Sequence, residues 1–116
     1  MNNKNIILDK SLEFALGIID FSEVLKEKKK YVIAKQLLKA GTSIGANIRE
    51  AQSCESRADF IHKLKIAAKE ADETDYWLLL CNLSPSYPKN EVLPPKLKEI
   101  QRLLSSIISS AKQNSK

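Results

Sequence analysis

Proline and glycine are scarce in this chain, and the prolines are confined to one region. The 116 residues include three glycines and four prolines, and all four prolines lie between positions 85 and 95. Proline removes a backbone donor and clashes with the preceding helical turn. Because residues 1–84 contain none, nothing in that stretch forbids long helices.

Residues that build metal and catalytic sites are also few. The chain has two cysteines and one histidine, too few for a disulfide framework or a zinc site. We interpret Cys54 and Cys81 as reduced thiols, with Cys81 in the core, and His62 as a solvated side chain on the polar side of a helix. No glycine-rich phosphate loop is present. We therefore expect no catalytic residues, no metal and no cofactor.

Long apolar runs are missing as well. The apolar patch at residues 6–8 ends at once at Asp9 and Lys10, so we expect no signal peptide. No run approaches the roughly 20 residues that span a membrane. We expect a cytoplasmic protein that does not enter a membrane.

The composition that is present is that of a folded domain with a positive charge. With 43% hydrophobic and 28% charged residues, the chain is globular rather than disordered. Its length predicts a single domain over residues 1–116. The net charge of +5 permits attraction to polyanions without requiring it.

Apolar residues recur at helical spacing, and no strand-like alternation of any length interrupts them. We predict four helices, at about residues 6–27, 30–52, 57–83 and 95–111. Ser56 and Asp59 form an S-x-x-D start for the third helix. Four helices with short connections pack antiparallel in neighbouring pairs. The predicted fold class is therefore all-α, an antiparallel up-down-up-down four-helix bundle.

Gly41 and Gly45 are the weak point of the second helix. Each costs roughly 1 kcal/mol relative to alanine in a helix interior. The apolar spacing nevertheless continues in phase across them. We therefore predict one continuous helix in which these glycines form a flat strip approached by another helix, with a break at residues 41–45 as the alternative.

The first and third helices carry more apolar surface than one bundle needs. The apolar positions of the first helix cover about half its circumference, which exceeds the usual core stripe. The third helix has a second apolar stripe at Ile66 and Trp77, which a symmetric copy of the chain could cover. Asp75 falls within the inner arc of the third helix and would need a partner if buried, for which Arg49 is a candidate.

Basic residues gather in three groups, and we identify the first two as candidate nucleic-acid contacts. They are Lys26, Lys28, Lys29 and Lys30 in the first turn, Arg57, Lys63, Lys65 and Lys69 on the third helix, and Lys96, Lys98 and Arg102 on the fourth. The alternative is that each group is a solvated helix face. Because aromatic residues are sparse beside the lysines, any nucleic-acid contact should be to phosphates rather than bases.

Two polar features receive structural interpretations. Four carboxylates within residues 70–75 could hold a hard cation, but on one helix they point in different directions. Ion pairing with lysines and arginines is the preferred interpretation. Asn47 lies on the apolar seam of the second helix, where a polar residue can fix register or oligomeric state.

Three motifs carry a family resemblance. They are S-I-x-x-N-I-x-E-A at Ser43–Ala51, F-x-x-x-L-x-I-A at Phe60–Ala67 and E-x-x-E-T-x-Y-W-L at Glu70–Leu78. Together they resemble the bacterial four-helix-bundle proteins named after 23S rRNA intervening sequences. The match spans about half of the chain. The first turn departs from the F-P-x-x-E form of many members and is rich in lysine instead.

The resemblance implies self-assembly and a link to RNA. Members are similar to the accessory variability determinant of diversity-generating retroelements, a basic barrel that works with a reverse transcriptase and its RNA, and they tend to form rings of five. The matching positions Asn47, Glu50, Glu70 and Glu73 are expected to make helix contacts within or between subunits.

These observations favour one function and leave a second open. We expect a non-enzymatic, self-assembling basic scaffold, a homopentamer that binds RNA, DNA or a nucleoprotein partner. The alternative is a protein-interaction module that docks a partner enzyme without touching nucleic acid.

Overall fold

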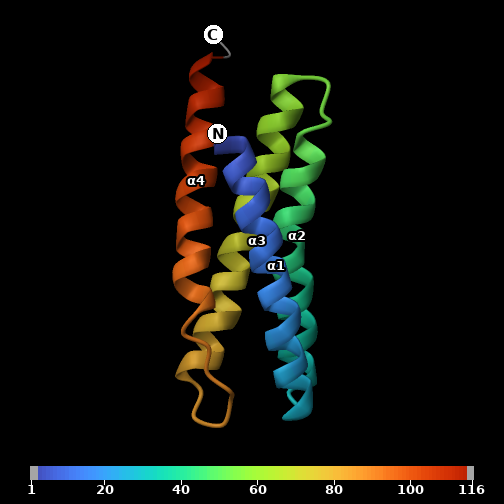
Figure 1. Ribbon diagram of the computed structural model, residues 1–116, viewed down its shortest axis with the longest axis vertical. Coiled ribbons are helices and arrows are strands. Elements are labelled where there is room, and N and C mark those ends of the chain that lie inside the picture. Colours follow the sequence, from blue (N-terminus) through green and yellow to red (C-terminus); the bar gives the residue numbers. More distant parts are fainter. Residues whose placement is uncertain (1–2, 115–116) are drawn as a thin grey trace.

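The computed structural model describes residues 3–114 and contains four helices (Figure 1). The helices are α1 (Asn3–Glu27), α2 (Tyr31–Ala51), α3 (Arg57–Leu83) and α4 (Leu93–Asn114). No strand occurs among these residues. The expected all-α fold class is confirmed. Within the described residues, no helix combines the length and the apolar character needed to cross a membrane.

Helices that follow one another along the chain lie side by side. α1 packs against α2, α2 against α3 and α3 against α4, and α4 returns to pack against α1 (Figure 1). The backbones of the diagonal pairs, α1 with α3 and α2 with α4, do not approach each other as the four adjacent pairs do. The result is an antiparallel up-down-up-down bundle that measures 50 × 22 × 21 Å.

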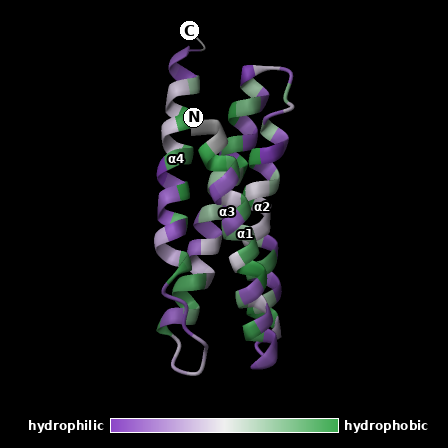
Figure 2. Ribbon diagram, viewed as in Figure 1, coloured by the Kyte–Doolittle hydropathy of each residue, from purple (hydrophilic) through white to green (hydrophobic). Residues whose placement is uncertain are grey.

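The core consists of apolar side chains that recur every three or four residues on each helix. Phe14 and Ile18 of α1 and Leu64 and Leu78 of α3 are almost fully buried, and Cys81 is buried as expected. In Figure 2 the hydrophobic positions run along the helices, whereas the turn between α1 and α2 is hydrophilic. Burial of this repeat holds the four helices together.

α2 runs without a break through its two glycines, so the prediction of one continuous helix is confirmed. Gly41 is buried, and a Cβ built on it would lie 2.7 Å from Cγ1 of Ile18. At Gly45 a Cβ would lie 3.4 Å from the backbone oxygen of Ser11. α1 therefore crosses close to α2 at this strip, and Gly41 is what permits the approach.

Three helix ends lie where the sequence predicts them: both ends of α3 and the end of α1. The Ser56 hydroxyl accepts from the Asp59 amide at 3.1 Å and caps α3, as the S-x-x-D pattern predicts. α1 ends at Glu27 as expected. It is followed by Lys29 at φ 63°, a left-handed residue that turns the chain.

The bounds of α4 differ from the predicted 95–111 at both ends. Asn90 Oδ1 accepts from the amides of Val92 and Leu93 at 3.0 and 2.9 Å, and the helix begins at Leu93, two residues before Pro95. At the other end no glycine or proline stops the helix, and it continues to Asn114. α1 likewise begins at Asn3 rather than at residue 6.

The expectation for Asp75 is wrong. Thr74 is the buried residue at this point of α3, and its hydroxyl donates to the Glu70 carbonyl at 2.7 Å. Asp75 is exposed, because the buried stripe of α3 passes through Ala71, Thr74 and Leu78, and Asp75 lies one position, about 100°, away from Thr74 around the helix. None of the ion pairs within residues 3–114 joins Asp75 to Arg49, which lines the groove between α1 and α2.

Candidate nucleic-acid interface

The two predicted basic groups lie at opposite ends of the bundle. Lys28 and Lys29 are exposed in the turn that follows α1, whereas Arg57 begins α3 at the other end of the molecule (Figure 1). Lys30 Nζ sits 4.8 Å from the ring centre of Tyr87, in the loop before α4. Because the bundle is 50 Å long, the two groups do not form one surface.

Two members of the α3 group are engaged by neighbouring helices. Lys63 Nζ donates to Glu50 Oε1 at 2.7 Å, and this hydrogen bond raises the pKa of Lys63. Arg57 donates to the Ala111 carbonyl at 3.4 Å, near the end of α4. Lys63 therefore links α3 to α2 through an ion pair, and Glu50 offsets its charge.

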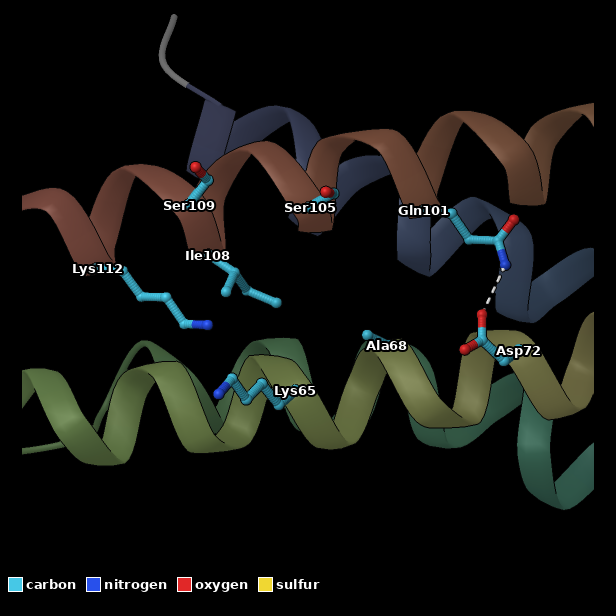
Figure 3. Close-up of a pocket in the computed structure, with 8 residues that line it drawn as sticks. All are labelled: Lys65, Ala68, Asp72, Gln101, Ser105, Ile108, Ser109 and Lys112. Carbon is cyan, nitrogen blue, oxygen red and sulfur yellow. Dashed lines mark hydrogen bonds between the residues drawn. The ribbon is translucent and has the colours of Figure 1, made fainter.

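Lys65 faces α4 instead, where it meets Lys112 (Figure 3). The two side chains reach toward each other across a groove of about 480 Å³ between α3 and α4. The nearby Lys112 ammonium is the main cause of a lowered pKa at Lys65, through direct contact and Coulomb repulsion, and desolvation acts in the same direction. Two positive charges are thus held together at one end of this groove.

Further basic residues continue from this groove along the molecule. Lys69 is exposed one helical turn after Lys65. On α4, Lys98 stands seven residues before the groove residue Ser105, and Arg102 seven before Ser109, so helical geometry places both on the same side. We call this set the basic face: Lys65, Lys69, Lys98, Arg102 and Lys112.

On the opposite side of α4, in contrast, the lysines form ion pairs with glutamates. There Lys10 pairs with Glu99 at 2.5 Å and Lys96 with Glu13 at 2.6 Å, joining α1 to α4. The hydrogen bond from Lys96 is the main cause of a lowered pKa at Glu13. On the basic face the one acid that lines the groove, Asp72, accepts from the Gln101 amide at 3.1 Å (Figure 3). Positive charge therefore accumulates on the basic face.

Sequence reasoning found Lys65 and Lys69 but missed Lys112. Lys112 lies just beyond the predicted end of the fourth helix at residue 111, whereas the structure places it in the last turn of α4. The spacing of seven residues that joins Lys98, Ser105 and Lys112 was the available signal, since it marks one stripe of a helix.

The residues predicted to make structural contacts hold local positions in the single chain. Asn47 Nδ2 donates to the Ser43 carbonyl of its own helix at 2.8 Å, and Trp77 Nε1 donates to Glu73 Oε2 at 3.2 Å. Ile66 and Trp77 are half-buried, and Glu70 is half-buried with its carbonyl bonded to Thr74. Contacts of these residues between subunits remain a prediction.

Large apolar side chains are exposed on α1, as the width of its apolar face predicts. Leu12, Leu16 and Ile19 are 52%, 57% and 41% exposed, and their spacing of four and three residues places them on one stripe. We call these three residues the α1 strip. On α3 the most exposed apolar side chains are Leu83, Tyr76 and Leu79, rather than Ile66 and Trp77.

The carboxylates of α3 do not assemble into a metal site. Asp72, Glu73 and Asp75 are exposed, and no group of three histidine, cysteine or acidic residues that could hold a metal ion occurs in the described part of the chain. His62 is exposed on α3. The sequence motif of four acids is therefore dispersed around the helix.

Comparisons with known proteins give a family and a solved relative. The model of the family described as 23S rRNA-intervening sequence protein matches residues 3–106. The chain is similar to a protein of unknown function from the S23 ribosomal protein family of Bacteroides thetaiotaomicron VPI-5482, whose crystal structure was determined at 1.70 Å resolution. The two share 48% identity over 93% of this chain and 99% of the other, with a TM-score of 0.87. No curated protein matches the chain.

Proposed function

The chain belongs to the family of 23S rRNA-intervening sequence proteins, and on that premise we propose that it is a non-enzymatic scaffold that assembles with its own copies and binds the phosphate backbone of RNA or DNA. Membership confirms the resemblance carried by the motifs of the second and third helices. The solved relative has no known function, so the support for this proposal comes from the surface of the chain itself.

The basic face is the observation that carries the proposal. Its five cations line one side of the α3–α4 pair, while lysines on the α1–α4 side are offset by glutamates. Phosphate contacts from lysine and arginine provide affinity that does not depend on sequence. A linear row of cations along two antiparallel helices suits a backbone better than a single small anion.

Self-assembly is supported by the α1 strip. A contiguous exposed apolar stripe on a small bundle favours contact with another protein surface. A second copy is the partner we propose, and the family resemblance favours a ring of five. Such a ring would present several basic faces to one nucleic acid, which raises affinity through multivalency.

The test is a titration of labelled structured RNA at several salt concentrations. We expect the logarithm of the binding constant to fall linearly with the logarithm of the salt concentration, because phosphates that bind the protein release their counterions. Triple charge reversal at Lys69, Lys98 and Arg102 should remove most of the affinity. The same reversal at Lys28, Lys29 and Lys30 alters net charge equally at the far end and serves as the matched control.

Two results would contradict the proposal. One is the absence of RNA binding by the wild-type chain at low salt, or binding without salt dependence. The other is an equal loss in both triple variants, because net charge alone would then explain the affinity.

A second candidate function also draws on the α1 strip. A protein-interaction module would use this strip to dock a partner enzyme, and its lysines would only solvate the surface. Capture of one protein partner that survives nuclease treatment and is lost on Leu16→Lys substitution would favour this candidate over nucleic-acid binding.

A further inference from the structure

An exposed aromatic ring lies on the same side of the bundle as the basic face. Tyr76 is 55% exposed on α3, and it stands seven residues after Lys69, so helical geometry places both side chains on one stripe of the helix. Aromatic residues are sparse beside the lysines in the sequence, and only the folded helix brings this ring and these cations to one side. An exposed ring beside cations suits an unpaired base, whose flat surface can stack on it.

The alignment of α3 with α4 brings Lys98 to the level of this ring. The Asp72 carboxylate accepts from the Gln101 amide at 3.1 Å, which shows where the two antiparallel helices meet. One helical turn onward from Asp72 is Tyr76, and about one turn back from Gln101 is Lys98. The ring therefore lies between Lys69 on its own helix and Lys98 on the neighbouring one, and all three side chains are exposed.

Carboxylates near the ring favour an uncharged group at this point. Asp72 and Asp75 are both exposed within one helical turn of Tyr76. Their negative charges repel a phosphate, whereas a base carries no charge. A nucleic acid on this surface would therefore place its phosphates at the cations of the basic face, and a base is the part that suits the ring.

The neighbouring indole fixes the surroundings of the ring. The ring centres of Tyr76 and Trp77 lie 5.7 Å apart, with their planes tilted by 56°, and Trp77 Nε1 donates to Glu73 Oε2 at 3.2 Å. A ring that is held in position before binding loses less conformational entropy when a base stacks on it. Trp77 is also the one tryptophan of the chain, so its fluorescence reports on this place.

We propose that Tyr76 is a stacking platform for one unpaired base of a single-stranded nucleic acid, while Lys69 and Lys98 bind the adjoining phosphates. The inference rests on the proposed function and adds the class of nucleic acid to it. In a duplex the bases stack on one another, so their flat surfaces are not available to the ring. Stacking requires no particular base, because every base has such a surface.

The experiment compares an unstructured single-stranded RNA with a duplex of the same length, each titrated at several salt concentrations. We expect tighter binding of the single strand, and saturable quenching of Trp77 fluorescence by the single strand and not by the duplex. Tyr76→Ala should weaken binding of the single strand by about fivefold to a hundredfold, the usual cost of losing one stacked base. Its salt slope should stay unchanged, because no phosphate contact is lost. Lys98→Gln should instead lower the magnitude of the slope by about 1.

Two control variants separate the ring from other effects. Tyr76→Phe retains the ring and should bind the single strand as the wild-type chain does. Tyr31→Ala removes a tyrosine that is 61% exposed on α2, outside the basic face, and should leave the affinity unchanged. Circular dichroism establishes that each variant is folded, and each should sediment as the wild-type chain does.

Equal affinity for the single strand and the duplex overturns the inference, as does a Tyr76→Ala variant that binds the single strand as tightly as the wild-type chain. An equal loss in Tyr76→Phe and Tyr76→Ala overturns it too, because the hydroxyl would then be responsible. So does altered sedimentation of Tyr76→Ala, which would place the ring between subunits. In all these cases salt-dependent RNA binding by the wild-type chain persists and the proposed function stands. That function fails only if neither RNA binds at low salt or the binding does not depend on salt.

Discussion

Gly41 sets how closely α1 and α2 can pack. A Cβ at this position would lie 2.7 and 2.8 Å from Cγ1 and Cγ2 of Ile18, a side chain with no solvent exposure. We predict that Gly41→Ala lowers the free energy of unfolding by about 1–3 kcal/mol, because overpacking of the core outweighs the gain in helix propensity of about 1 kcal/mol. Chemical denaturation measures this difference.

Gly45 is the matched control for that substitution, since it lies one turn away on the same helix. A Cβ there would make ordinary contact with Ser11 at 3.4 Å, so Gly45→Ala should stabilise the protein by up to about 1 kcal/mol. Combination with Ile18→Ala should reduce the cost of Gly41→Ala. If the two substitutions changed the free energy of unfolding equally, helix propensity rather than packing against α1 would determine the stability at both glycines.

At the scale of the helix, the start of α3 depends on one side chain. The Ser56 hydroxyl is the acceptor that caps this helix, through the Asp59 amide. We predict that Ser56→Ala lowers the free energy of unfolding by about 1 kcal/mol. Ser56→Asp should leave stability nearly unchanged, because aspartate caps helices as well as serine does. A loss of similar size in both variants would mean that the cap bond contributes little.

Helices were predictable from this sequence because their signals are local. The apolar repeat and the S-x-x-D start lie within a few residues of the features they determine, and α3 was placed at its observed bounds. The bounds of α4 were less predictable, because its cap comes from Asn90 within an irregular loop. Asp75 was misplaced because a spacing of three or four residues from Ala71 fits both Thr74 and Asp75, and the structure buries Thr74.

The candidate interface was only partly predictable, because it joins two helices. Lys65 was identified as a basic residue of α3, but its meeting with Lys112 depends on how α3 and α4 are aligned along their length. The sequence places Lys63 and Lys65 in one basic group, but Lys63 faces α2 and Lys65 faces α4. Only the packing of the helices distinguishes the two. Clusters of charge in a sequence therefore do not by themselves identify one surface.

At the scale of the whole molecule, the α1 strip predicts the state of the particle. We expect the wild-type chain to sediment as a multiple of its 13.0 kDa mass, and Leu16→Lys to shift it toward a single chain. Leu16 is 57% exposed in the single chain, so the substitution should change the stability of the bundle by no more than about 0.5 kcal/mol.

The control for this experiment is Leu83→Lys on α3. Leu83 is 71% exposed and lies outside the α1 strip, so its substitution should leave the sedimentation unchanged. A wild-type particle of one chain, or dissociation by Leu83→Lys to the same extent, would argue against assembly through α1.

The order of helices around the bundle also bears on how the chain finds its fold. Three of the four helix interfaces join neighbours in sequence, so each can close after a short search. The α1–α4 seam alone must bring together segments separated by most of the chain, and ion pairs such as Lys10–Glu99 cross it. That seam carries the largest chain-entropy cost of closure. We therefore expect the α1–α4 interface to form last during folding and to open first during unfolding.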